Sequence, residues 1–77
     1  LIGFAQLKFR RGEIAESRII VDRFNRATDP TSESLWLALR IARTVGDRTA
    51  EASYTSQLRR EFAGSPEYQK LVKGQYD

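Results

Sequence analysis

Hydrophobic residues recur along the whole chain with the spacing of three to four residues that marks amphipathic helices. The clearest stripe lies in residues 31–45 and is formed by Leu35, Ala38, Leu39, Ala42 and Val45, widened by Trp36, Leu37 and Ile41. Weaker stripes of the same period run through residues 1–10, 13–26, 49–62 and 66–76. No stretch alternates with the two-residue period of a strand. The pattern therefore predicts five helices and an all-α fold.

Glycine and proline mark the expected ends of these helices. Gly12 and Gly46 follow the first and third stripes, and a glycine in a left-handed turn is a common helix end. Asp29-Pro30 and Ser65-Pro66 precede the third and fifth stripes. Each pair offers an N-cap oxygen followed by proline at the first helical position, so we expect both pairs to open a helix.

The order of helix, glycine turn, helix and proline occurs twice along the chain. The step from Gly12 to Gly46 and the step from Pro30 to Pro66 are nearly equal, and both are close to one tetratricopeptide (TPR) repeat of about 34 residues. TPR proteins are built from helical hairpins that stack into a right-handed α-solenoid with a shared core. We expect a single TPR fragment with repeat one at 1–29, repeat two at 30–64 and a terminal capping helix at 65–77.

Composition removes most catalytic chemistry. The 77 residues include no cysteine and no histidine, so disulfides, thiolate metal sites and histidine-based acid–base catalysis are excluded. We expect no enzymatic activity, no cofactor and no metal. The net charge of +3 lies in residues 1–26, which hold six basic and three acidic groups. That excess either steers an acidic partner or is a solvated helix face.

TPR arrays present a concave surface lined by the first helix of each hairpin. With Gly12 and Gly46 as the turn residues, the candidate groove positions are Gln6, Phe9, Arg10, Trp36, Arg40 and Arg43. Tryptophan and arginine are typical of binding hot spots, and arginine holds carboxylates through forked hydrogen bonds. A register shift of one residue would move Trp36 into the core. The sequence therefore allows two positions for this side chain, in the core or in the groove. For Arg40 and Arg43 the alternative is a solvated position at the rim.

A second basic group lies towards the C-terminus and consists of Arg59, Arg60, Lys70 and Lys73. It suggests a nucleic-acid patch, but glutamates interrupt it and no RNA-binding motif accompanies it. We therefore expect no nucleic-acid partner. A small basic helical nucleic-acid-binding module is the third hypothesis for the function of the chain, after the two protein-binding hypotheses given below.

Residues 35–69 resemble the last repeat of the type IV pilus biogenesis and stability proteins, the PilF/PilW family. The segments that carry the resemblance are Arg40-Ile41-Ala42-Arg43, Gly46-Asp47-Arg48 and Ala50-Glu51-Ala52-Ser53-Tyr54. Residues 1–34 share only general TPR character with the family.

The resemblance implies a non-enzymatic pilotin on the periplasmic face of the bacterial outer membrane. Such lipoproteins bind outer-membrane secretin subunits and assist their localisation or multimerisation. The chain begins at Leu1 inside an apolar pattern, so we expect a fragment whose lipid anchor lies further N-terminal and provides the only contact with the membrane. We also expect self-association through the exposed face of the first repeat. A generic TPR adaptor for another peptide partner is the alternative.

Overall fold

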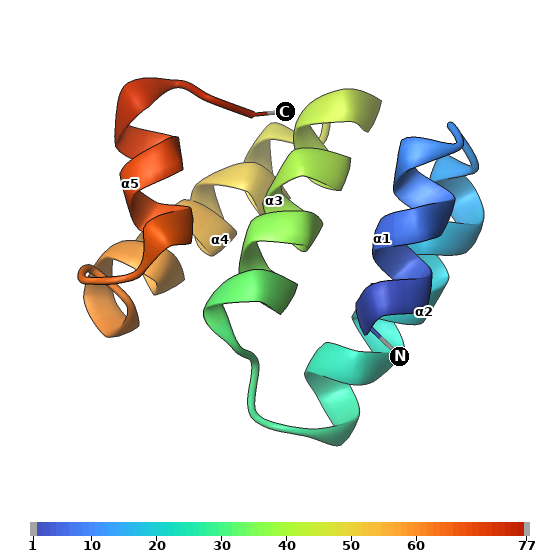
Figure 1. The fold of residues 1–77 in the computed structure, drawn as a ribbon, viewed down its shortest axis with the longest axis horizontal. Coiled ribbons are helices and arrows are strands. Elements are labelled where there is room, and N and C mark those ends of the chain that lie inside the picture. The colour runs from blue at the N-terminus through green and yellow to red at the C-terminus, as the bar shows by residue number, and fades with distance from the viewer. Residues whose placement is uncertain (1, 77) are drawn as a thin grey trace.

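The computed structural model describes residues 2–76, which form five α-helices and no strand. The helices are α1 (Ile2–Arg10), α2 (Ile14–Ala27), α3 (Ser32–Val45), α4 (Arg48–Glu61) and α5 (Pro66–Lys73). The predicted all-α fold is confirmed. Figure 1 shows two helical hairpins, α1–α2 and α3–α4, followed by α5. Helices α1, α3 and α5 lie side by side in one layer, with α2 and α4 behind them.

Helix α3 is the centre of the molecule and contacts each of the other four helices. Most of its buried side chains divide between two core clusters that share this helix. The first joins α3 to the α1–α2 hairpin and contains Ala5, Val21, Leu37, Ala38 and Ile41. The second joins it to α4 and contains Leu35, Trp36, Leu39 and Leu58. Helix α3 is therefore packed between the first hairpin on one side and α4 on the other.

Val45 and Phe4 are among the residues of the predicted stripes that lie outside these clusters. Val45 is 46% exposed because it stands in the last turn of α3, next to the turn that ends the helix. Phe4 is 52% exposed on α1, and the ammonium of Lys8 lies over its ring, 5.3 Å from the centroid. Together with Leu7 and Ile19, Phe4 leaves apolar surface on the first hairpin.

The helix ends follow the glycines as predicted, with one correction at the start of α3. Gly46 has a φ of 79° and its N–H donates to the carbonyls of Ala42 and Arg43. Asp29-Pro30 does not open α3; the N-cap is Thr31. The Thr31 hydroxyl accepts the Ser34 N–H at 3.1 Å, while the Ser34 hydroxyl accepts the Thr31 N–H at 2.8 Å. This reciprocal capping box satisfies two helix-end donors and places Pro30 outside the helix.

The last helix begins as predicted and ends earlier than predicted. Ser65 caps it by accepting the N–H of Tyr68 at 3.1 Å, and Pro66 is its first residue. Gly74 adopts a φ of 70° and ends the helix after Lys73, so residues 74–76 are not helical. The chain then turns back towards α3 (Figure 1).

No helix within residues 2–76 is both long enough and apolar enough to cross a lipid bilayer.

Candidate protein-binding groove

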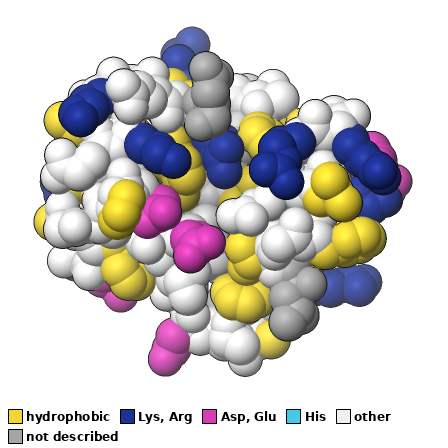
Figure 2. All heavy atoms as spheres, viewed as in Figure 1, with side chains coloured by type: hydrophobic (Ala, Val, Ile, Leu, Met, Phe, Trp, Pro, Cys, Tyr) yellow, Lys and Arg dark blue, Asp and Glu magenta, His cyan; other side chains and the backbone are white. Residues whose placement is uncertain are grey.

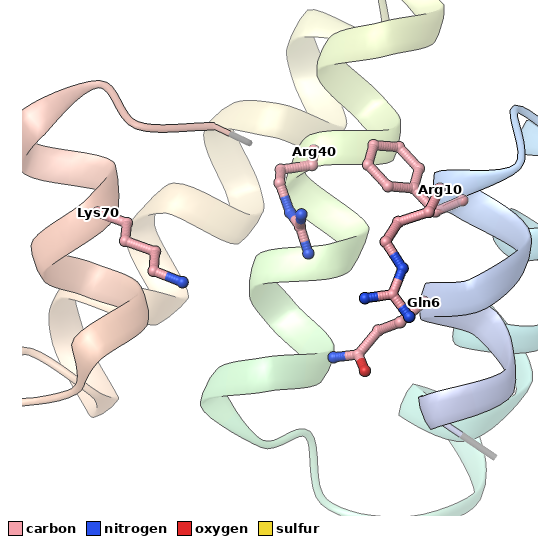
Figure 3. A pocket seen from close by; sticks show the side chains of 5 residues that line it. Gln6, Arg10, Arg40 and Lys70 are labelled. Atoms are coloured by element: carbon pink, nitrogen blue, oxygen red, sulfur yellow. The ribbon is translucent and has the colours of Figure 1, made fainter.

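A pocket of about 570 Å³ lies between α1, α3 and α5. Its lining comes from all three helices and consists of Gln6, Phe9, Arg10, Arg40 and Lys70. Figure 3 shows the labelled side chains of α1, α3 and α5 pointing into one shared space. Four of the six predicted groove residues thus line a single pocket, while Trp36 and Arg43 do not line it.

Arg40 is the most enclosed cation of this pocket. Its guanidinium carbon lies 5.2 Å from the centroid of the Phe9 ring and 5.5 Å from that of Trp36. The Nε atom of Arg40 is buried and has no hydrogen-bond partner among residues 2–76. Burial lowers the pKa of Arg40, and the nearby charge of Arg10 lowers it further. Because an arginine remains protonated in proteins even so, the pocket contains a half-buried positive charge.

The pocket carries three cations and no acidic side chain. Arg10, Arg40 and Lys70 form no ion pair with any residue in the range 2–76. Lys8, by contrast, is paired at 3.0 Å with both Glu13 and Glu16. Figure 2 shows basic side chains in a band across the same face, over α5, α3 and α1. This arrangement attracts anions and has no anion of its own among the described residues.

The other two predicted groove residues contact Tyr76 instead of lining the pocket. Trp36 is 3% exposed and belongs to the second core cluster. The ring of Tyr76 stacks on it with centroids 5.7 Å apart and an interplanar angle of 21°. The Arg43 guanidinium lies 3.9 Å from the centroid of the Tyr76 ring, and its Nη1 is 3.3 Å from Glu51 Oε2. Tyr76 therefore packs along the face of α3 that carries Trp36 and Arg43.

Sequence reasoning missed two residues of this surface. Lys70 was grouped with the C-terminal basic residues, although it stands one repeat length beyond the groove candidate Trp36. Tyr76 was placed in the last helical stripe, because nothing in the hydrophobic spacing shows that Gly74 ends the helix. The basic group itself is divided in space: Arg59 lines a separate depression that also contains Glu51, whereas Lys70 lines the pocket.

No cluster of acidic residues suited to holding a metal ion occurs in the described part of the chain. The chemistry that this pocket offers is the binding of charged and aromatic groups.

Comparison with known proteins finds a similarity to a pilus assembly protein. The type IV pilus assembly protein PilF of Pseudomonas aeruginosa is 36% identical to the chain over 67 residues. The chain is PilF-like. The match covers 87% of the chain and 27% of PilF, so the chain spans about a quarter of the length of this relative. No protein-family model and no solved structure gives a significant match. The resemblance to PilF seen in the sequence is thereby confirmed.

Proposed function

We propose that this chain is part of a non-enzymatic TPR scaffold of type IV pilus assembly and that its groove holds a segment of a partner protein. The similarity to PilF supports the pilus setting. The observation that carries the binding role is the pocket itself, because three neighbouring helices contribute cations, an amide and an aromatic ring to one space. Arginine and aromatic side chains in such a concave surface are typical of hot spots in protein interfaces.

The proposed partner is the outer-membrane secretin. This assignment rests on the PilF/PilW resemblance of residues 35–69 and makes the chain part of a pilotin at the periplasmic face of the outer membrane. The repeats proposed are 1–29 and 30–64, with the terminal segment 65–77, which contains α5, as the cap. In this reading the residues that contact the secretin are Gln6, Phe9, Arg10, Arg40 and Arg43, to which the pocket adds Lys70. The predicted groove residue Trp36 is buried in the core and lies beneath Arg40 instead of contacting the partner.

A complementation experiment tests the proposal. The gene that contains this segment is deleted and then restored in its original form, as Arg40→Glu, or as Arg59→Glu. Arg59 is the matched control because it is an exposed arginine outside the pocket. Outer membranes are blotted for heat- and detergent-resistant secretin multimer, surface pili are counted, and the level of each variant is measured on the same blot.

We expect the deletion and Arg40→Glu to lose multimer while the secretin monomer persists, and Arg59→Glu to behave like the original. Normal multimer and normal pili in the deletion strain would contradict the pilotin role. Normal multimer with lost pili would favour the alternative, a TPR adaptor in the same pathway with another partner.

A further inference from the structure

We infer that residues 66–76, called the C-terminal flap below, form a movable wall of the groove that opens while both hairpins stay folded. The flap consists of α5 and the three residues that follow it. Its Lys70 side chain points into the pocket from α5 (Figure 3), so opening the flap widens the groove from one side. The inference rests on the proposed function for the ligand, and it adds how a partner segment enters the groove and is held there.

The first argument is that few polar contacts join the flap to the two hairpins. Among the described residues, one hydrogen bond crosses this boundary, from Ser32 Oγ to Glu67 Oε1 at 2.9 Å. No ion pair within residues 2–76 includes a residue of the flap. The two hairpins, by contrast, are joined to each other by the ion pair of Arg18 with Asp47, also at 2.9 Å. Separating the flap therefore breaks little polar structure.

The second argument is that the apolar contacts of the flap lie at the edge of the core. Helix α5 has no buried residue, and Tyr68, Leu71 and Tyr76 pack half-buried against the second core cluster. The end of the flap is held by Tyr76, whose ring stacks on Trp36. Segments with few buried apolar contacts open at a lower free energy than the core does. The flap should therefore open before the hairpins unfold, with Tyr76 as its latch.

The third argument is the connection between α4 and α5, which has room to act as a hinge. It comprises residues 62–65, in which Ala63 and Gly64 are exposed. No other residue of the described chain comes within 4 Å of the place that a Cβ would take at Gly64. Hinges are short loop segments of this kind, because a few backbone torsions absorb the whole movement.

The pocket couples closure of the flap to the ligand. Closing the flap brings Lys70 to a space that already holds Arg10 and Arg40, and like charges repel each other. A partner segment that fills this space contacts the flap and the hairpins together only when the flap is closed. Because a ligand shifts an equilibrium towards the form it binds better, binding should hold the flap closed.

The test is amide hydrogen exchange in the free 77-residue chain, followed residue by residue by NMR. The amides of residues 70–73 report on the flap, because an eight-residue helix is not stable once it is undocked. The amides of Leu39 and Ile41 report on the core helix. Two variants separate the movements: Tyr76→Ala removes the latch, and Val21→Ala weakens the first core cluster, which contains no residue of the flap.

We expect the flap amides to exchange about tenfold or more faster than those of Leu39 and Ile41. Their rates should also depend less on urea, because opening the flap exposes less surface than unfolding. Tyr76→Ala should speed flap exchange about two- to tenfold, the worth of an aromatic pair, and Tyr76→Phe should not. Val21→Ala should speed exchange in the core helix and leave the flap unchanged.

Two results would overturn the inference. One is a common rate and a common urea dependence for flap and core amides, a comparison that needs no variant. The other is a flap rate that rises with Val21→Ala as much as the core rate does.

A second experiment adds the purified monomeric secretin subunit and reads exchange by mass spectrometry of peptic fragments. We expect exchange in the flap to slow on binding, whereas a bound subunit that slows exchange in α1 and α3 alone would overturn closure on the partner. The outcome is separable from that of the proposed function. A subunit that does not bind would contradict the secretin assignment, and exchange in the free chain would still decide the flap. Loss of multimer in the deletion strain, with flap and core exchanging together, would do the reverse.

Discussion

Leu39 should be among the side chains on which the fold depends most. It has no exposed surface and packs in the cluster that includes Leu35, Trp36 and Leu58. Truncation of a fully buried leucine to alanine costs about 2–5 kcal/mol, because transfer energy is lost and a cavity remains. A chain of this length has a total stability of roughly 4–12 kcal/mol. Since each kcal/mol lowers the melting temperature of a small domain by about 4–8 °C, Leu39→Ala should lower it by about 10 °C or more.

The assay is thermal and urea unfolding followed by circular dichroism in the helical band. The matched control is Leu7→Ala, the same substitution at a position of α1 that is 38% exposed. We expect the control to lose less than half as much stability, because much of its side chain is already in water. Equal losses in the two variants, or a melting temperature of Leu39→Ala within about 2 °C of the original, would refute the assignment of α3 as the shared core helix.

Two further predictions concern the C-terminal segment and the turn between α3 and α4. Tyr76→Ala should cost about 1 kcal/mol, the worth of an aromatic pair, and expose the Trp36 ring. Trp36 fluorescence should move to longer wavelength and become more quenchable by acrylamide, while Tyr76→Phe should change neither; unchanged quenching in Tyr76→Ala would refute the stacking. The pKa of Asp47 is held below its usual value of 3.8 by the hydrogen bond from the Ala50 N–H and by Arg18. This stabilisation is present above about pH 4 and is lost as the pH falls through the lower folded-state value. Asp47→Asn should therefore melt below the original chain at pH 7 and converge with it as the pH falls through the folded-state pKa, and a constant gap between the two melting curves would contradict the cause given.

The helices could be predicted because their signals are local. Hydrophobic spacing placed all five, and Gly46 and Ser65-Pro66 marked ends that the structure reproduces. The start of α3 was mispredicted because two caps compete within a few residues. Thr31 and Ser34 exchange hydrogen bonds with each other's backbone, and this reciprocal pair prevails over the single oxygen that Asp29 offers.

The groove was harder to predict because it depends on how helices pack. The repeat period aligned Gln6 with Arg40, and the structure brings both to one pocket. The contribution of α5 depends on how that helix packs on α3, which hydrophobic spacing within each helix does not reveal. The position of Tyr76 depends on the left-handed backbone torsion at Gly74. Gly74 is the same kind of helix-end signal as Gly46, but the apolar spacing continues past it to Tyr76 and so favoured a longer helix.

Core and groove are built on the same helix, and this sets how variants of α3 should be interpreted. Leu37, Leu39 and Ile41 are buried, so the rotation of α3 about its axis is fixed by packing. That rotation directs Arg40 towards α1 and α5, where it lines the pocket. A core substitution in α3 therefore disturbs binding through the position of Arg40, whereas a change at the Arg40 guanidinium leaves the core intact. Arg40→Lys separates the two effects, because it keeps the charge and the length of the side chain and removes only the planar fork.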